Sequence, residues 1–190
     1  MDRSLKASLL ISLTAVNLAL GALVSYLKLP IYLDTVGLLL ATITLGFGWG
    51  LACAVLTVGV GFFVINPYLP AYVLTGVAIC ATTELLFRLK MFDTLLRSVI
   101  SGLAIAIVSA TVSAPVTTYL FGGITLSGAD AVTAYFLATG KTLLNSALLA
   151  GLSSEPVDKV LVAIVVYFTL LRIPLRTAAR FGLRLPSRPS

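Results

Sequence analysis

Three charged residues stand within five positions of one another, directly before an almost wholly apolar run. Glu155, Asp158 and Lys159 belong to the stretch SSEPVDK, and twelve mostly apolar residues follow it. Charges are costly next to lipid, so the cluster is either the capped end of a helix or part of a binding site. A lysine at a helix start opposes the helix dipole, and Lys159 therefore needs a partner: Asp158, Asp34 or an anionic ligand group.

Further polar and aromatic side chains gather in other connections between apolar runs. Polar groups that converge over apolar walls are the usual make-up of a small-molecule site, and tyrosine rings can stack on a flat ligand. We expect the SSEPVDK charges at the rim of such a pocket, wetted or paired with ligand. The predicted substrate-binding residues are Tyr32, Asp34, Asn66, Tyr68, Tyr135, Lys141, Asn145, Asp158 and Lys159.

Three of the acids, Asp34, Asp130 and Glu155, also have a simpler interpretation as helix caps. Asp34 precedes TVGLLLA, and Glu155 precedes Pro156, a residue that is favoured at the first position of a helix. The sequence thus predicts that the last helix begins at Glu155–Pro156. Elsewhere, Glu84 lies one turn before Arg88, a spacing that predicts an ion pair on one helix.

Catalysis is poorly supported by the residue types present. The chain has no histidine, which excludes a Ser-His-Asp or Cys-His pair and the common histidine metal sites. ATGKT resembles the end of a phosphate-binding loop, but Tyr135 stands where that loop needs its first glycine. We predict no catalytic residue, no metal and no cofactor. An intramembrane enzyme acting on a lipid through Asp34, Asp158 and Lys159 is an alternative.

The composition is that of a membrane protein. Of the 190 residues, 59% are hydrophobic and 11% are charged, and the mean hydropathy is +1.08. A soluble domain carries about 25% charged residues. We therefore predict one all-α integral membrane domain over 1–190. Apolar runs at 5–27, 35–47, 50–65, 71–87, 95–120 and 157–174 are the expected spans, and a further run covers 131–150.

The charges favour six spans over seven. With six spans and both termini in the cytoplasm, ten basic residues lie inside and three outside, in line with the positive-inside rule. A seventh span would move the basic tail, 175–190, outside. The 131–150 run is then an extracytoplasmic or half-inserted helix between the fifth and sixth spans. The ten inner residues are Arg3, Lys6, Arg88, Lys90, Arg97, Arg172, Arg176, Arg180, Arg184 and Arg188.

Small residues recur along one face of the first apolar run. Ser8, Ser12, Ala15, Ala19 and Ala22 are spaced by four, three, four and three positions. Small residues let two membrane helices approach closely. The stripe either packs within the bundle or docks a separate membrane subunit, and for the second case the predicted docking residues are Ser12, Ala15, Ala19 and Ala22.

With this chain length, six spans and an AxxxA stripe, the sequence resembles the S components of energy-coupling factor (ECF) vitamin transporters. YLDTVG, FVINPYLPAY, GGITLSG and SEPVDK…LRIPLR look like segments of that superfamily, and the resemblance covers nearly the whole chain. Asp158 and Lys159 resemble an acid and a lysine at the outer start of the last helix in biotin S components, where the two are not adjacent.

The resemblance implies a substrate-binding subunit for uptake of a small water-soluble vitamin or related micronutrient across the inner membrane of a prokaryote. It implies three partners, a transmembrane coupling protein that faces Ala15 and Ala19 and two cytoplasmic ATPases that alone use ATP. No nucleic acid is involved, and which vitamin is bound is left open. The alternatives are a helical membrane scaffold that uses the small-residue stripe, and a solitary passive carrier.

Overall fold

The computed structural model describes residues 3–186, which form helices and no strand. Arg188, which the charge count includes, lies outside these residues, as does the end of the basic tail, 187–190. The elements are α1 (Arg3–Tyr26), α2 (Val36–Leu45), α3 (Phe47–Val64), the short 3-10 helix η1 (Leu69–Tyr72), α4 (Val73–Arg88), α5 (Leu95–Phe121), α6 (Ala129–Ala138), α7 (Leu143–Arg172) and α8 (Leu175–Phe181).

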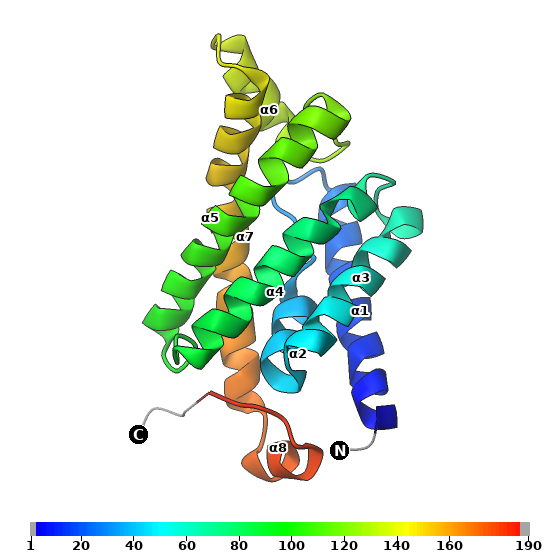
Figure 1. Ribbon diagram of the computed structural model, residues 1–190, viewed down its shortest axis with the longest axis vertical. Helices are drawn as coiled ribbons and strands as arrows, with labels where there is room; N and C mark the ends of the chain where they lie inside the picture. The colour runs from blue at the N-terminus through cyan, green and yellow to red at the C-terminus, as the bar shows by residue number, and fades with distance from the viewer. Residues whose placement is uncertain (1–2, 187–190) are drawn as a thin grey trace.

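The helices form an elongated bundle whose two ends differ (Figure 1). Helix α1 starts at the end that carries α8, and the described chain also finishes there. Helix α6 caps the opposite end. We call these the α8 end and the α6 end. Both described ends of the chain thus lie at one end of the bundle, as the even number of spans predicts.

Four helical segments are long and apolar enough to cross a membrane: 3–26, 47–64, 69–88 and 95–121. Helix α2 has only 10 residues, about half of what a span usually needs. Helix α7 is long enough but carries Glu155, Asp158 and Lys159. The protein is therefore a helical membrane protein by length and composition, and six spans stay a prediction.

Helix α2 is an inner helix, and all of its residues are buried. Its Gly37 amide donates a hydrogen bond to Asn17 Oδ1 of α1 at 2.6 Å. A Cβ at Gly37 would lie 2.0 Å from the Leu13 carbonyl oxygen, so the two helices can touch only through glycine. The helix ends at Gly46 with φ +105°, a conformation that favours glycine, and α3 begins at the next residue. The break between the runs expected at 35–47 and 50–65 is therefore the single residue Gly46.

Asn17 joins three helices in the middle of the bundle. It is fully buried, accepts from Gly37 of α2, and donates from Nδ2 to Thr57 Oγ1 of α3 at 3.1 Å. A longer contact reaches Cys53 Sγ at 3.7 Å. Asn17 was not among the predicted functional residues, although a lone amide within an apolar run requires partners on neighbouring helices.

The prediction that the last helix begins at Glu155–Pro156 is wrong. Helix α7 starts at Leu143, with Thr142 as its N-cap accepting from the Asn145 amide at 3.4 Å, and Pro156 lies inside it. The predicted 131–150 helix is likewise divided, because α6 ends at Ala138 and the chain reverses through Gly140 (φ +83°).

Close packing against α5 explains why α7 continues through Pro156. A Cβ on Gly151, before the proline, would meet Ala110 Cβ at 3.1 Å. A Cβ on Gly102 of α5 would lie 2.7 Å from the Lys159 carbonyl oxygen, after the proline. The two helices are thus in intimate contact on both sides of Pro156, and this packing offsets the one backbone hydrogen bond that proline removes.

The small-residue stripe of α1 faces away from the bundle. Ser8, Ser12, Ala15 and Ala19 are exposed and Ala22 is partly buried. The buried face of the helix is Leu10, Thr14, Asn17, Gly21 and Val24. The stripe therefore does not pack within this bundle, and docking of a separate subunit stays a prediction.

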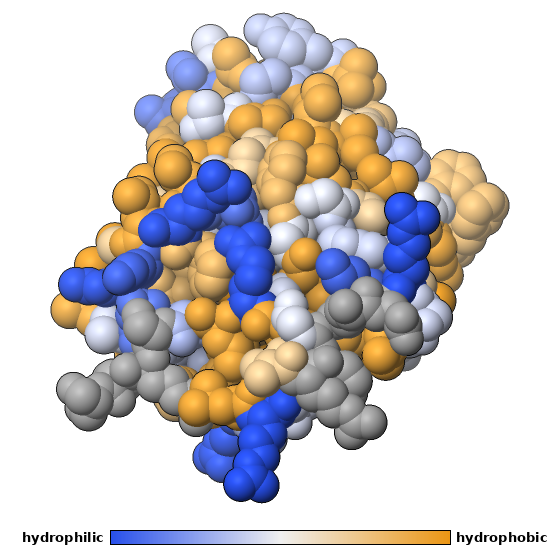
Figure 2. All heavy atoms as spheres, turned by 60° about the horizontal axis from the view of Figure 1, so that its bottom comes forward, coloured by the Kyte–Doolittle hydropathy of each residue, from blue (hydrophilic) through white to orange (hydrophobic). Residues whose placement is uncertain are grey.

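Charged side chains gather at the α8 end, where Figure 2 shows long hydrophilic side chains over a largely hydrophobic surface. The predicted ion pair is confirmed, with Arg88 Nε 2.8 Å from Glu84 Oε1. Arg184 joins it from beyond α8, with Nη1 3.0 Å from Glu84 Oε2. Its backbone amide also donates to the Thr44 carbonyl at 2.9 Å. These contacts hold the segment after α8 against α2 and α4.

Candidate small-molecule site

A cavity of about 150 Å³ opens between the helices toward the α6 end. Its walls come from α1, α2, α3, α4, α5 and α7, together with η1 and the connections 27–35, 65–68 and 122–128. One water needs ~15 Å³ measured in this way, so the space suits a small organic molecule. The apolar wall includes Val24, Leu38, Ile65 and Ile79.

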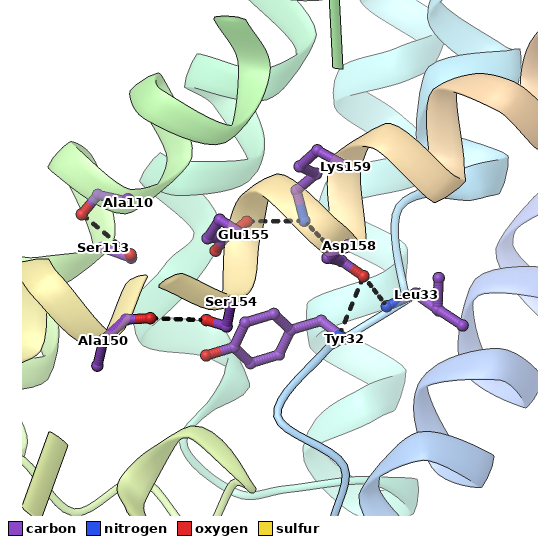
Figure 3. Close-up of polar contacts among 9 residues, drawn as sticks. All are labelled: Tyr32, Leu33, Ala110, Ser113, Ala150, Ser154, Glu155, Asp158 and Lys159. Atoms are coloured by element: carbon purple, nitrogen blue, oxygen red, sulfur yellow. Dashed lines mark hydrogen bonds and ion pairs between the residues drawn. The ribbon is translucent and has the colours of Figure 1, made fainter. Parts of the chain in front are cut away.

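A buried ion cluster from α7 forms one side of the cavity (Figure 3). The Lys159 ammonium lies 3.1 Å from Glu155 Oε2 and makes a second, very short contact with Asp158 Oδ2. Glu155, Asp158 and Lys159 are 5%, 0% and 2% exposed. The charges are therefore not open to bulk water, which contradicts one half of the expectation, whereas the other half, that they pair with a ligand, stays a prediction.

Asp158 ties the connection between α1 and α2 to α7. Its Oδ1 accepts from the amides of Tyr32 at 3.1 Å and Leu33 at 2.7 Å (Figure 3). Leu33 has φ +51°, a left-handed conformation that is strained for a leucine. The carboxylate thus holds a strained turn in place, and through its other oxygen it holds Lys159.

A second connection covers the same end of the cavity. Asp130 accepts from the Thr125 amide and hydroxyl at 2.9 and 2.7 Å, which shapes the loop 122–128. Asn66 Nδ2 donates to the Thr125 carbonyl and anchors this loop on the α3–η1 connection. A Cβ at Gly128 would lie 2.3 Å from the Leu29 carbonyl oxygen. The two covering connections therefore meet backbone to backbone.

Aromatic rings line the cavity beneath these loops. Tyr68 packs on Phe121, with ring centroids 4.6 Å apart, and the Tyr72 hydroxyl hydrogen-bonds Thr117 Oγ1 at 2.8 Å. The Lys159 ammonium lies 5.8 Å from the centroid of the Tyr32 ring. Two buried wall hydroxyls, of Thr35 and Thr75, have no hydrogen-bond partner within residues 3–186. Unpaired buried hydroxyls are costly, so these two are candidates for contact with a ligand.

Burial sets the protonation of the α1–α2 connection. It raises the pKa of the Asp34 carboxyl, an effect opposed by the nearby Lys159 charge and reinforced by Asp158. It also raises the pKa of the Tyr32 hydroxyl, with a further rise from Glu155. Tyr32 therefore stays neutral, and Asp34 ionises less readily than an exposed aspartate.

The structure brings together five of the nine predicted binding residues: Tyr32, Asp34, Asn66, Tyr68 and Lys159 line the cavity. Asp158 does not line it and instead supports Lys159 and the Tyr32 backbone. Three others are exposed and do not line it: Tyr135, Lys141 and Asn145.

Several lining residues were not predicted from the sequence. Glu155 stands four residues before Lys159 and so shares its helix face, a signal that was present but was interpreted as a helix start. Ser109, Ser113 and Thr117 line the wall from α5 at spacings of four. Repeated hydroxyls on one face of an apolar helix are a usable signal for a polar wall.

Within residues 3–186, no group of three or more cysteine, aspartate or glutamate side chains is placed to hold a metal ion. No protein family profile matches the chain, and no curated protein or solved structure is detectably similar to it.

Proposed function

We propose that the protein is a membrane-embedded binding subunit for a small water-soluble vitamin or related micronutrient. It works as the S component of an ECF-type transporter in a prokaryotic cell membrane, and its termini are cytoplasmic. The observation that carries the proposal is the cavity between the helices, with its buried lysine, its tyrosine rings and its two covering connections. A scaffold protein has no need to keep such a space or to bury charges beside it.

The exposed stripe on α1 supports the transporter assignment. Ala15 and Ala19 are small, exposed and lie on a face of an apolar helix that the bundle leaves open. Close helix contact through small residues is the means by which membrane helices associate. In this proposal the partners are a transmembrane coupling protein, which docks on that face, and two ATPases, which supply the energy.

The direct test is a screen of water-soluble vitamins by the shift in melting temperature of the detergent-purified protein. A ligand at about 100 times its Kd stabilises the folded state by ~2.7 kcal/mol. The variant Ser113→Phe fills the cavity from α5 and should abolish the shift. Ser153→Phe, which adds the same ring at an exposed position of α7, should leave it intact. Absence of any shift would leave the scaffold alternative.

Proteoliposomes separate a binding subunit from a solitary carrier. Vesicles that contain this protein alone should bind the vitamin found in the screen but should not equilibrate it across the membrane. Equilibration without partners would identify a passive carrier.

A further inference from the structure

The charges around the cavity do not balance. Three carboxylates, of Asp34, Glu155 and Asp158, lie at or directly behind its wall, together with one cation, Lys159. Lys159 is already shared by Glu155 and Asp158. Within residues 3–186, no salt bridge reaches Asp34. The other lysines of this end, Lys28 and Lys141, are exposed and do not line the space.

A carboxylate without a paired cation in a partly enclosed cavity is unfavourable, and it is relieved either by a proton or by a cation. A cationic ligand would supply the missing charge directly. An anionic ligand would add a fourth negative group beside a lysine whose contacts with two carboxylates are already made. The net charge of the wall therefore favours a cation over an anion.

The rings of the wall point to the same ligand chemistry independently. Tyr32, Tyr68 and Tyr72 all line the cavity. The faces of aromatic rings attract cations at centroid distances within ~6 Å, and Lys159 already occupies such a position over Tyr32, at 5.8 Å. Three tyrosine side chains together with carboxylates form a suitable environment for an ammonium group or a cationic heterocycle.

We infer that the cavity binds a small organic cation, with Asp34 and Glu155 as its counter-ions and the tyrosine rings around its charge. The inference rests on the proposed function as a binding subunit and specifies its class of substrate. In this arrangement Lys159 does not recognise the ligand directly, and its ion pairs hold the Glu155 and Asp158 side chains in position.

The test is a library of small ring compounds in matched sets of cation, neutral molecule and anion. One set is 1-methylnicotinamide, nicotinamide and nicotinate. Melting-temperature shifts of the detergent-purified protein are measured at one concentration, and hits are titrated by calorimetry. The compounds that shift the melting temperature should be the cations, and each should bind with at least tenfold higher affinity than its neutral counterpart.

The outcomes distinguish a failure of the inferred preference for cations from a failure of the proposed binding function. Binding of anions or neutral molecules in preference to cations would overturn the inference and leave the binding function standing. No binding in any set, including the vitamins, would overturn both.

Variants of the wall sharpen the result. Asp34→Asn should lower the affinity for the tightest-binding cation by about ten- to a hundredfold, the equivalent of losing one charge-assisted contact. It should leave the affinity for the neutral counterpart of that cation unchanged. The matched control is Asp93→Asn, the same change in the α4–α5 connection at the α8 end, which should alter neither affinity. An equal loss for the cation and the neutral molecule in Asp34→Asn would show that Asp34 only shapes the site, and would overturn its role as counter-ion.

Discussion

Two ion clusters fasten distant connections to the bundle, and they differ chiefly in the exposure of their cations. In the middle of α7, Lys159 is paired with Glu155 and Asp158, and all three are nearly inaccessible. At the α8 end, Glu84 is 7% exposed and is paired with Arg88 and Arg184, whose side chains are 72% and 36% exposed. Both clusters join a helix to a distant connection, but only in the first are the acids and the cation all buried.

This difference in solvent exposure indicates what each cluster contributes to the protein. Exposed pairs contribute ~0–1 kcal/mol each because water and salt screen them. A buried pair is expensive to form and expensive to break, so it is weak evidence for stability and better evidence for a specified arrangement. The buried cluster borders the cavity and fixes the α1–α2 connection, whereas the exposed cluster only fastens the end of the chain.

The largest effect is expected from Lys159→Met, because it leaves two carboxylates buried without their cation. Breaking a buried pair costs ~3–5 kcal/mol, which lowers the melting temperature of a chain of this size by roughly 10 °C. Thermal unfolding in detergent measures this. Adding Glu155→Gln should recover part of the loss, and a Lys159→Met protein as stable as the parent would show that the cluster is not desolvated.

Asp158→Ala is expected to have the next largest effect. It removes the carboxylate that accepts hydrogen bonds from the Tyr32 and Leu33 amides. Loss of hydrogen bonds to a charged group lowers the free energy of unfolding by ~1.5–3 kcal/mol. Hydrogen exchange of these two amides should become faster, while that of α4 stays slow. Asp158→Asn should do less, since its amide oxygen still accepts. Unchanged exchange in the alanine variant would mean that the α1–α2 connection is held by other contacts.

Arg184→Ala tests the exposed cluster and should cost no more than ~1 kcal/mol. Glu84 keeps Arg88 at 2.8 Å, so the acid is not left unpaired. The expected change is faster proteolysis after α8, with nearly the same melting temperature. Arg176→Ala, at an exposed position of α8, serves as control. A loss of stability as large as that of Lys159→Met would contradict the contrast between the two ion clusters.

Ala19→Leu should change stability least, within ~0.5 kcal/mol, because the residue is exposed. In the proposed function it weakens assembly with the coupling subunit, measured by co-purification of the two. Gly21→Val is the contrasting variant on the inner face, where a Cβ would lie 3.0 Å from Ile65 Cδ1 and 3.1 Å from Asp34 Cβ. It should destabilise the protein by itself, and Ala19→Leu should not.

The helices were largely predictable because apolar runs and their breaks are local signals. The first run was expected at 5–27 and is helical over 3–26, and the fifth was expected at 95–120 and is helical over 95–121. The start of α7 was missed because Pro156 was interpreted by its local preference alone. Sequence evidence that the helix continues through Pro156 was available in the small residues on both sides of it, which include the buried Ala150 and Ala163.

The site was predictable only in part, since its decisive contacts join distant residues. Lys159 was correctly expected to need an acid, and Asp158 was among the candidates. No spacing rule connects Asp158 with the amides of Tyr32 and Leu33, more than 120 positions away. Burial of the cluster also depends on α5, whose Gly102 allows α7 to approach so closely.

The central position of Asn17 has a consequence for the order in which the protein is made. Its partners at Gly37, Cys53 and Thr57 follow it by 20 to 40 positions, so α1 emerges from the ribosome with a polar amide that nothing yet satisfies. The charges of α7 differ, because Lys159 meets its counter-ions on its own helix. A fragment that ends at Pro30 therefore lacks every partner of Asn17, whereas a fragment that extends past α3 contains all of them.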